Sequence, residues 1–302
     1  MYDYIIIGAG SAGCVLANRL SEDPKVKVLL LEAGCRDTRK EIHIPLAFSK
    51  LFKGPCDWTY FTEPEAQLGN RSLYWPRGKM LGGSSSMNAM IYIRGNRADY
   101  DQWRDQGNPG WGYADVLPYF KKSEKQERGA SEYHGASGPL CVSDLRTVNP
   151  LAEAFVAAGE EVGLQRNPDF NGTQQDGVGF YQVTQNKGKR HSCAAAFLHP
   201  VASRKNLTVK TETHVLGSIL KASAPQSSAF SRGTTACRSG LSAKLFCAPA
   251  RSVRRSCSCS PVLVLPTICV TSMFLLHAIC RELARICKTI RLAPRCLNVP
   301  SP

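Results

Sequence analysis

Three glycines near the start of the chain have the spacing of a dinucleotide-binding turn. Gly8, Gly10 and Gly13 form a G-x-G-x-x-G motif, and Glu32 follows 19 residues after the last of them. In such a turn the first glycine permits a tight bend, the second lets the backbone approach a pyrophosphate, and the third lets the helix lie close to the strand. The acidic residue accepts hydrogen bonds from a ribose hydroxyl. The spacing predicts a dinucleotide site without separating NAD from FAD, and a glycine-rich turn with no ligand remains the alternative.

The residues around these glycines predict the elements that would position them. Residues 4–7 are mostly β-branched and apolar, as in a strand buried on both faces, and residues 14–20 have the apolar spacing of a helix. Residues 26–31 form a second apolar run that ends at Glu32, and residues 207–210 predict a further strand. This order of strand, turn, helix and strand is the context that the motif requires, with free N–H groups at the helix start facing the phosphates.

A second glycine-rich segment contains Gly82 and Gly83, which precede three serines. A loop of this composition exposes backbone donors and lets an anionic or heteroaromatic ligand come close. A flexible linker is the alternative. Apolar side chains on both sides favour a packed segment instead: Met80, Leu81, Met87 and Met90.

The residues from 77 to 101 read RGKMLGGSSSMNAMIYIRGNRADYD, and at this point the sequence resembles a known family. The segment is similar to the first signature of the glucose-methanol-choline (GMC) oxidoreductases, which are FAD enzymes that oxidise alcohols. Further stretches resemble the family in order and spacing: the N-terminal glycine motif, EAG at 32–34, DWTYFTEP at 57–64 and RHS at 190–192. The resemblance covers residues 1 to about 220.

The resemblance implies FAD as the cofactor and assigns residues to it. Gly83 and the stretch 88–90 would lie against the flavin ring and its ribityl chain, Val215 would contact the adenine through its backbone, and residues 34–53 would cover the cofactor. Trp58 takes the place of an aromatic residue near the lid of the cofactor site, and a tryptophan of the hydrophobic core is an equally good interpretation. The expected cofactor-binding residues are Gly8, Gly10, Ser11, Ala12, Gly13, Glu32, Ala33, Trp58, Gly82, Gly83, Asn88, Ala89, Met90 and Val215.

The expected fold class is α/β, with a Rossmann-like FAD-binding domain, part of an α+β substrate domain and a disordered C-terminal segment. Residues 1–149 would form the FAD-binding domain, and residues 150–185 would begin the substrate-binding domain. Residues 186–220 would return to the FAD domain, and residues 221–302 would form a non-native tail. Residues 150–163 combine good helix formers with a glycine stop, which predicts a helix.

The resemblance implies oxidation of a primary alcohol to an aldehyde by hydride transfer to flavin N5, with an aliphatic alcohol as the favoured substrate. Choline is the alternative, and Trp75, Pro76 and Ala89 are the visible departures from the choline dehydrogenases. In the family a histidine takes the alcohol proton, and it belongs to a C-terminal part that has no counterpart here. We therefore assign no catalytic residue, since none of the six histidines occupies that position: His43, His134, His191, His199, His214 and His277.

The charge of the chain is unevenly distributed. Residues 221–302 contain twelve basic residues and one acid, a net charge of +11 that leaves +3 of the total +14 for residues 1–220. Such a tail raises the alternative of a non-enzymatic protein that binds nucleic acid or a membrane, yet the tail has neither interleaved aromatic residues nor an amphipathic period. An NAD-dependent dehydrogenase is a third hypothesis, and the glycine-serine segment at 82–86 argues against it.

The positions of the cysteines and the hydropathy of the chain predict whether it holds a metal, crosses a membrane or lies in the cytoplasm. Eight of the 13 cysteines lie after residue 236, yet no C-x2-C pair or paired histidines accompany them, so we expect no metal site. Pro266 and polar residues interrupt the apolar residues 262–280, so we expect no transmembrane span. Dispersed cysteines and the lack of a visible leader favour the cytoplasm, with peripheral membrane association left open. The expected partners are a small-molecule alcohol and an unidentified electron acceptor, and not nucleic acid.

The last part of the chain resembles the product of translation in the wrong reading frame. The second signature of the family, of the type GAxxSPQLLMLSGIGP, is absent from its place near Ala243. When the codons of residues 243–264 are regrouped by a shift of frame, a permitted codon choice spells REVILCAGAVGSPQLFMLSGIG. The same shift at residues 280–290 spells PGVGQNLQDH, and residues 221–230 give a stretch that resembles the next family strand. We therefore interpret residues 221–302 as out of frame and expect an inactive chain; a genuine basic, cysteine-rich tail is the alternative.

Overall fold

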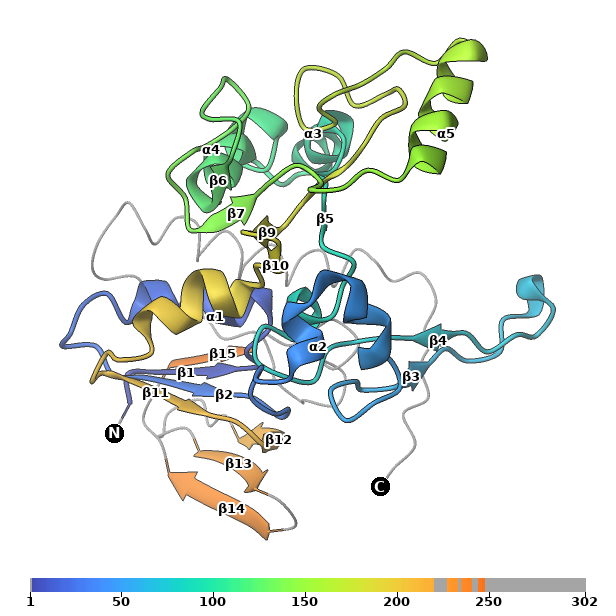
Figure 1. The fold of residues 1–302 in the computed structure, drawn as a ribbon. Helices are drawn as coiled ribbons and strands as arrows, with labels where there is room; N and C mark the ends of the chain where they lie inside the picture. Colours follow the sequence, from blue (N-terminus) through green and yellow to red (C-terminus); the bar gives the residue numbers. More distant parts are fainter. Residues whose placement is uncertain (1, 220–226, 233–234, 241–243, 248–302) are drawn as a thin grey trace. The chain divides into compact units, whose positions relative to one another are not determined.

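The computed structural model describes residues 2–219, 227–232, 235–240 and 244–247. The chain forms two compact units, whose elements are labelled in Figure 1. The first unit consists of Met1–Ile42, Leu46–Met87 and Cys193–Pro302. The second unit consists of His43–Pro45 and Asn88–Ser192.

A four-stranded parallel sheet forms the centre of the first unit. Its strands are, in order, β11 (Leu207–Lys210), β2 (Val28–Leu31), β1 (Tyr4–Ile7) and β15 (Lys244–Cys247). Ile5, Ile7, Leu29 and Leu31 form a buried cluster on one face. Strands β1 and β2, in the middle of the sheet, are almost wholly apolar because both faces of a parallel sheet are covered.

The strands predicted at 4–7 and 207–210 are confirmed at their predicted bounds. The strand predicted at 26–31 begins at Val28 instead. The reason is local, because the N–H of Lys27 donates to the Asp3 carboxylate at 2.8 Å rather than to a neighbouring strand.

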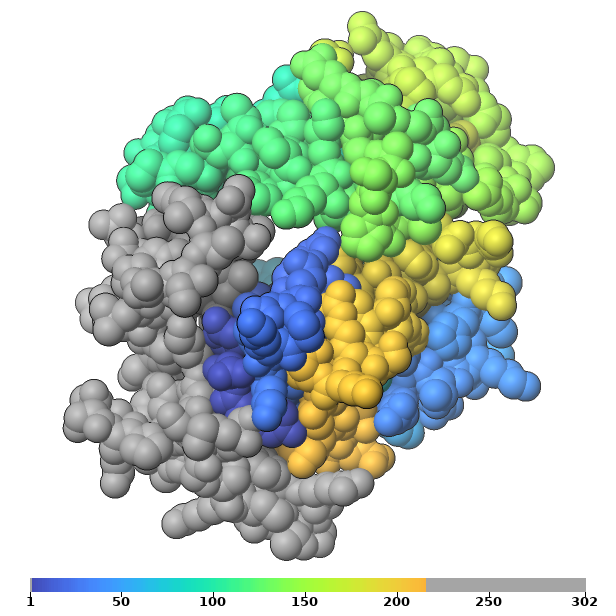
Figure 2. All heavy atoms as spheres, turned by 90° about the vertical axis from the view of Figure 1, so that its left-hand side faces the viewer, coloured from blue at the N-terminus to red at the C-terminus, as the bar shows by residue number. Residues whose placement is uncertain are grey.

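Helix α1 (Ser11–Leu20) connects β1 to β2, as the glycine motif predicts. Cys14 and Ala17 on its inner face have no exposed surface. The side-chain amide of Asn18 donates to the Phe197 carbonyl at 2.7 Å and joins α1 to η4 (Ala194–Leu198), which η5 (His199–Val201) follows. Figure 2 shows N-terminal residues in blue beside residues near position 200 in gold on this side of the unit.

The remaining elements of the first unit are short helices, a hairpin and an antiparallel sheet. The short helices are α2 (Lys40–His43), η1 (Pro45–Leu51), η2 (Ala66–Leu68) and η3 (Gly83–Ser86). The hairpin is β3 (Tyr60–Phe61) with β4 (Tyr74–Trp75), and the sheet is β12 (Thr213–Ile219), β13 (Ser227–Arg232) and β14 (Thr235–Gly240). Strands β13, β14 and β15 fall within residues 221–302, where we expected disorder, so these parts of the tail are extended and paired. The other residues of the tail lie outside the described residues.

The second unit combines three helices with short strand pairs. The helices are α3 (Arg97–Asp105), α4 (Tyr113–Ser123) and α5 (Pro150–Glu161). The pairs are β5 (Ile91–Tyr92) with β8 (Gln182–Val183), β6 (Glu124–Gln126) with β7 (Leu140–Val142), and β9 (Gln185–Asn186) with β10 (Lys189–Arg190). The helix predicted at 150–163 is confirmed: Asn149 caps its first turn, and Gly163 with a φ of 94° follows its end.

The two units divide the chain at other points than the domains predicted from the sequence. Residues 88–149, expected in the FAD-binding domain, belong to the same unit as residues 150–185, and so do residues 186–192. The units are defined by contacts within the chain, whereas the predicted domains are defined by what each part binds. The domain assignment therefore stays a prediction. In the part of the chain that is described, no helix has the length and apolar character needed to cross a bilayer; residues 262–280 lie outside it.

Candidate dinucleotide site

The glycine turn joins β1 to α1 in the first unit. Gly8 has a φ of 90°, which glycine adopts readily, and its N–H donates to the Leu31 carbonyl at 2.7 Å. Gly10 is the N-cap residue of α1, and no side chain caps this helix end. A Cβ atom on Gly10 would meet no atom within 4 Å. The turn therefore leaves space beside the positive end of a helix, which suits an anionic pyrophosphate.

The first turn of α1 combines exposed and buried positions. Ser11 and Ala12 are exposed, whereas Gly13 is buried. A buried third glycine agrees with its expected part in bringing the helix close to the strand. The Cys14 N–H already donates to the Gly10 carbonyl at 2.9 Å, so the regular hydrogen bonds of the helix begin there.

Glu32 follows β2 directly and contacts the glycine turn. Its Oε2 accepts the Ala9 N–H at 2.7 Å, and its Oε1 accepts the Gly34 N–H at 2.8 Å. Desolvation raises the pKa of Glu32, which is 5% exposed, while these N–H groups, that of Ala33 and the charge of Lys79 oppose the increase. Each carboxylate oxygen keeps a lone pair for a further donor, such as a ribose hydroxyl. The prediction that the glycine turn and Glu32 lie together is confirmed.

Gly82 and Gly83 lie directly on the glycine turn. The Gly82 N–H donates to the Ala9 carbonyl at 2.7 Å. A Cβ atom on Gly83 would lie 2.8 Å from the Gly10 Cα, and the φ of Gly83 is 53°, so neither the space nor the backbone admits a side chain. The segment is packed, as the apolar flanks predicted, and is not a linker.

The serine hydroxyls of this loop hold the loop itself. Ser86 Oγ donates to the Leu81 carbonyl at 2.7 Å, and Ser85 Oγ donates to the Gly82 carbonyl at 2.6 Å. Ser85 Oγ also accepts the Cys193 N–H at 2.9 Å. Two of the three serine hydroxyls therefore fix the backbone of this loop.

Trp58 lies beside the strand that carries Val215. Its ring stacks on Tyr60, with centroids 5.7 Å apart, and meets His214 edge-on at 5.5 Å. The Lys79 ammonium lies 4.8 Å from the centroid of the Trp58 ring. Trp58 is half-buried, so its assignment to the cofactor site stays a prediction beside that of a core tryptophan.

Strand β12 brings Val215 towards Glu32. The Thr213 N–H at the start of β12 donates to the Glu32 carbonyl at 2.8 Å, and Val215 packs against the buried cluster of β1 and β2. Burial lowers the pKa of His214, and the charge of Lys79 lowers it further. Glu32, Trp58 and Val215 thus lie in one neighbourhood of the first unit.

Asn88, Ala89 and Met90 belong to the second unit, whereas all other predicted cofactor-binding residues belong to the first. Asn88 Oδ1 accepts the Met90 N–H at 3.1 Å and a hydrogen bond from Arg190 Nη1 at 2.8 Å. Asn88 and Ala89 are exposed, and Met90 has a φ of 63°, unusual for a residue with a side chain. Burial lowers the pKa of Arg190 to about 10.

Two residues of these neighbourhoods were not among the predicted site residues. Lys79 lies over Trp58, and Arg190 bonds to Asn88. Each is a charged residue of a motif, RGKM or RHS, that carries the resemblance. Membership in these family motifs is the signal by which both residues could have been found from the sequence.

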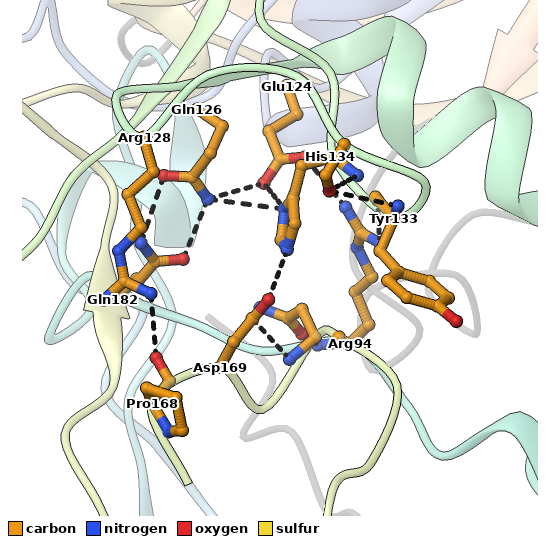
Figure 3. A network of polar contacts seen from close by, with 12 residues as sticks. Arg94, Glu124, Gln126, Arg128, Tyr133, His134, Pro168, Asp169 and Gln182 are labelled. Carbon is orange, nitrogen blue, oxygen red and sulfur yellow. Dashed lines mark hydrogen bonds and ion pairs between the residues drawn. The ribbon is translucent and has the colours of Figure 1, made fainter.

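A buried ionic network surrounds His134 in the second unit (Figure 3). His134 Nδ1 lies 2.9 Å from Glu124 Oε1, and its Nε2 lies 2.9 Å from Asp169 Oδ2. Glu124 Oε2 also pairs with Arg94 Nη2 at 2.9 Å. Hydrogen bonds to Asp169 and then to Glu124 raise the pKa of His134 to about 9. A histidine that two carboxylates keep protonated at neutral pH is a poor general base.

Two glutamines extend this network across the unit. The side-chain amides of Gln126 and Gln182 bond each other at 2.8 and 3.1 Å, and Gln182 Nε2 also donates to Asp144 Oδ1 at 2.9 Å. Arg128 pairs with both Asp144 oxygens and donates to the Pro168 carbonyl at 2.9 Å. The network joins several segments of the second unit to one another. Its polar groups are used in these contacts, so we interpret it as a structural feature.

Comparisons with known proteins place the chain among flavoenzymes. A family model described as GMC oxidoreductase matches residues 2–236. The alcohol dehydrogenase (acceptor) of Pseudomonas putida is 56% identical over 216 residues, which are 71% of this chain and 39% of that protein. The mitochondrial choline dehydrogenase of Homo sapiens is 50% identical over 222 residues, which are 71% of this chain and 37% of that protein. The chain thus spans less than half the length of these relatives.

Solved structures agree with the sequence relatives. Pyridoxine 4-oxidase from Mesorbium loti superposes with a TM-score of 0.77 at 36% identity, over 82% of this chain and 49% of that chain. An FAD-dependent oxidoreductase from Chaetomium thermophilum gives a TM-score of 0.73 at 31% identity, over 82% of this chain and 45% of that chain. The match to the family model ends at residue 236, beyond the predicted boundary at residue 220.

Proposed function

The chain belongs to the GMC oxidoreductase family, and we propose that it carries the FAD-binding part of an enzyme that oxidises a primary alcohol to an aldehyde. The observation that supports this best is the contact between Gly83 and Gly10. Two glycine turns far apart in the sequence meet there, beside a helix end that no side chain caps. Such a site suits a cofactor whose pyrophosphate comes close to the backbone.

The residues of the first unit fit the adenosine diphosphate part of FAD. The N–H groups at the start of α1, beside Gly10, would hold the pyrophosphate, and Glu32 would accept hydrogen bonds from the ribose. The Val215 backbone and the Trp58 ring would lie at the adenine. The family resemblance assigns the flavin ring and ribityl chain to Gly83 in the first unit and to the stretch 88–90 in the second.

When bound, FAD supplies an acceptor for the hydride that leaves the alcohol carbon, at flavin N5. The chain itself must then bind the alcohol and remove its hydroxyl proton. A base for that step needs a pKa near the operating pH, and removing such a base typically costs about 10²–10⁴-fold in rate. The family base lies beyond the residues matched here, and His134 is engaged by two carboxylates.

We propose an aliphatic primary alcohol as the substrate of the complete enzyme. Identity to the alcohol dehydrogenase is 56%, against 50% for the choline dehydrogenase. Trp75, Pro76 and Ala89 also depart from the choline type. Choline remains the second candidate because the difference in identity is small.

We further propose that the 302-residue chain is inactive and retains flavin weakly. Residues 221–302 read as out of frame, and a permitted choice of codons for residues 243–264 spells a family signature in the shifted frame. Strand β15 (Lys244–Cys247), which neighbours β1, lies within that stretch. The basic tail could instead bind nucleic acid or a membrane, and no described residue favours that alternative.

The test is to express the 302-residue chain beside a version with the frame restored. Flavin absorbance of the purified proteins measures retention, and reduction of an artificial dye measures turnover with a panel of aliphatic alcohols and choline. We expect flavin and turnover only in the restored protein, with the greatest kcat/KM for an aliphatic alcohol. Turnover of alcohol by the 302-residue chain would contradict the proposed inactivity, and a preference for choline would contradict the proposed substrate.

A further inference from the structure

Two cysteine thiols of the first unit lie in contact. Cys35 Sγ and Cys56 Sγ are 3.3 Å apart, although 21 positions separate the residues in the sequence. Cys56 is 2% exposed, whereas Cys35 is half-buried. A reagent in solution can therefore approach Cys35 more easily than Cys56.

Backbone hydrogen bonds join both cysteines to the same segment of the chain, residues 79–81. The Cys35 carbonyl accepts the Leu81 N–H at 3.0 Å, and the Cys56 carbonyl accepts the Lys79 N–H at 2.8 Å. A Cβ atom on Gly34 would lie 1.9 Å from the Lys79 carbonyl oxygen, so the backbone before Cys35 also lies tightly against this segment. The positions of both sulfurs thus depend on paired backbone and not on free loops.

The thiols lie at the edge of a small hydrophobic core. Cys56 belongs to this core, and Cys35 packs against it from outside. The other buried members are Ile42, Leu51, Met80 and Met87. Fixed apolar surroundings limit the ways in which the two sulfurs can separate.

We propose that Cys35 and Cys56 form an oxidisable dithiol, which closes into a disulfide bond on exchange with a small disulfide such as glutathione disulfide. An S–S bond is about 2.05 Å long, so the two sulfurs need to approach by roughly 1.2 Å. The Cys35 thiolate attacks glutathione disulfide and releases one glutathione thiolate, and Cys56 then attacks the Cys35 sulfur and releases the second. Two protein thiols are oxidised, one glutathione disulfide is reduced to two thiols, and the two protein protons pass to the released glutathione.

The surroundings of Cys56 slow the second step. Desolvation and then the hydrogen bond with Cys35 raise the pKa of Cys56 to about 11; the charge of Glu41 adds to this and that of Arg39 opposes it. Because the attacking species is the thiolate, ring closure accelerates about tenfold per pH unit well below that pKa.

A closed bond would restrain the chain between the two cysteines. Residues 36–55 contain α2 and η1, and the family resemblance places this stretch over the cofactor. A cross-link over a loop of this length typically stabilises a folded chain enough to raise Tm by roughly 5–10 °C.

Peptide mapping of the 302-residue chain tests the proposal directly. The folded protein is incubated with glutathione disulfide, free thiols are alkylated, and the protein is digested with trypsin. Cleavage after Lys27, Arg36, Lys53 and Arg71 gives peptides 28–36 and 54–71, each with one cysteine. We expect these two peptides to be found linked, with a yield that rises with pH between 7 and 9.

Matched variants separate ring closure from general oxidation. Cys56→Ala should trap the glutathione adduct on Cys35, and Cys141→Ala, which changes a half-buried cysteine of the second unit, should leave the linked peptides unchanged. The wild-type map needs no variant to fold. A wild-type protein in which Cys35 keeps its glutathione adduct even at pH 9, links to another cysteine or remains unmodified would overturn the proposal.

Discussion

Two regions of the molecule use polar groups in opposite ways. In the glycine cradle (Gly8–Gly13, Glu32 and Gly82–Gly83), the start of α1 has no side-chain cap and the space beside Gly10 holds no protein atom within 4 Å of a built Cβ. In the His134 network (Arg94, Glu124, His134 and Asp169), the Glu124 carboxylate bonds to Arg94, to His134 and to the Gly135 N–H. The first region has N–H groups that no described side chain caps, and the second joins its charges to one another.

The contrast separates an uncapped helix end from a polar core whose charges are paired. Desolvated charges are costly unless partners of the same chain surround them, as they surround Glu124. Donors at a helix end can instead remain open to solvent until an anion arrives. Helices α3 and α5 show the difference, because the side chains of Asn96 and Asn149 cap their first turns. The N-cap residue of α1, Gly10, has no side chain to do so.

The largest effect is expected from Glu124→Gln in the His134 network. The change removes the charge that Arg94 and His134 share, and the Arg94 side chain, 3% exposed, keeps a buried charge. We expect the free energy of unfolding to fall by about 3–5 kcal/mol, measured by urea unfolding. The control is Glu22→Gln, whose pair with Arg19 is exposed and whose loss should cost less than about 1 kcal/mol. Equal losses in both variants would remove the distinction between buried and exposed pairs.

A smaller effect is expected from pH. Folding raises the pKa of His134 from an ordinary 6.5 to about 9. The stabilisation is therefore complete below pH 6.5 and is lost as the pH rises through about 9. Between these values, wild type should lose about 2–3 kcal/mol of unfolding free energy relative to His134→Gln. Parallel pH profiles of the two proteins would show that His134 is not held in its charged form.

In the glycine cradle, Gly83→Ala should impair cofactor binding. The new Cβ would lie 2.8 Å from the Gly10 Cα, at a φ of 53°. We expect an unfolding free energy lower by about 1–3 kcal/mol and, in the frame-restored protein, FAD affinity at least about tenfold weaker. The control is Gly69→Ala, with a φ of 67° and no atom within 4 Å, which shares the backbone strain and should keep its affinity. If both variants bind FAD equally well, contact between the two glycine turns does not matter for binding.

Local patterns made much of the first unit predictable. The strands β1 and β11, the helix α1 and the meeting of Glu32 with the glycine turn follow from short-range spacing of apolar residues and glycines, and so does helix α5 of the second unit. Sequence alone did not predict the His134 network, because its members come from separated segments without a common spacing. The contact between Cys35 and Cys56 was missed for the same reason, since the cysteines looked dispersed.

The central claim is that the space beside Gly10 belongs to the cofactor, and Gly10→Ala tests it most directly. The added methyl group would meet no atom of the described residues within 4 Å, so the Tm without FAD should stay within about 2 °C of wild type. The same methyl group would occupy the approach of the pyrophosphate. Titration of the flavin-free, frame-restored protein with FAD should therefore show a Kd at least about tenfold higher in the variant. An unchanged Kd at unchanged Tm would contradict the account.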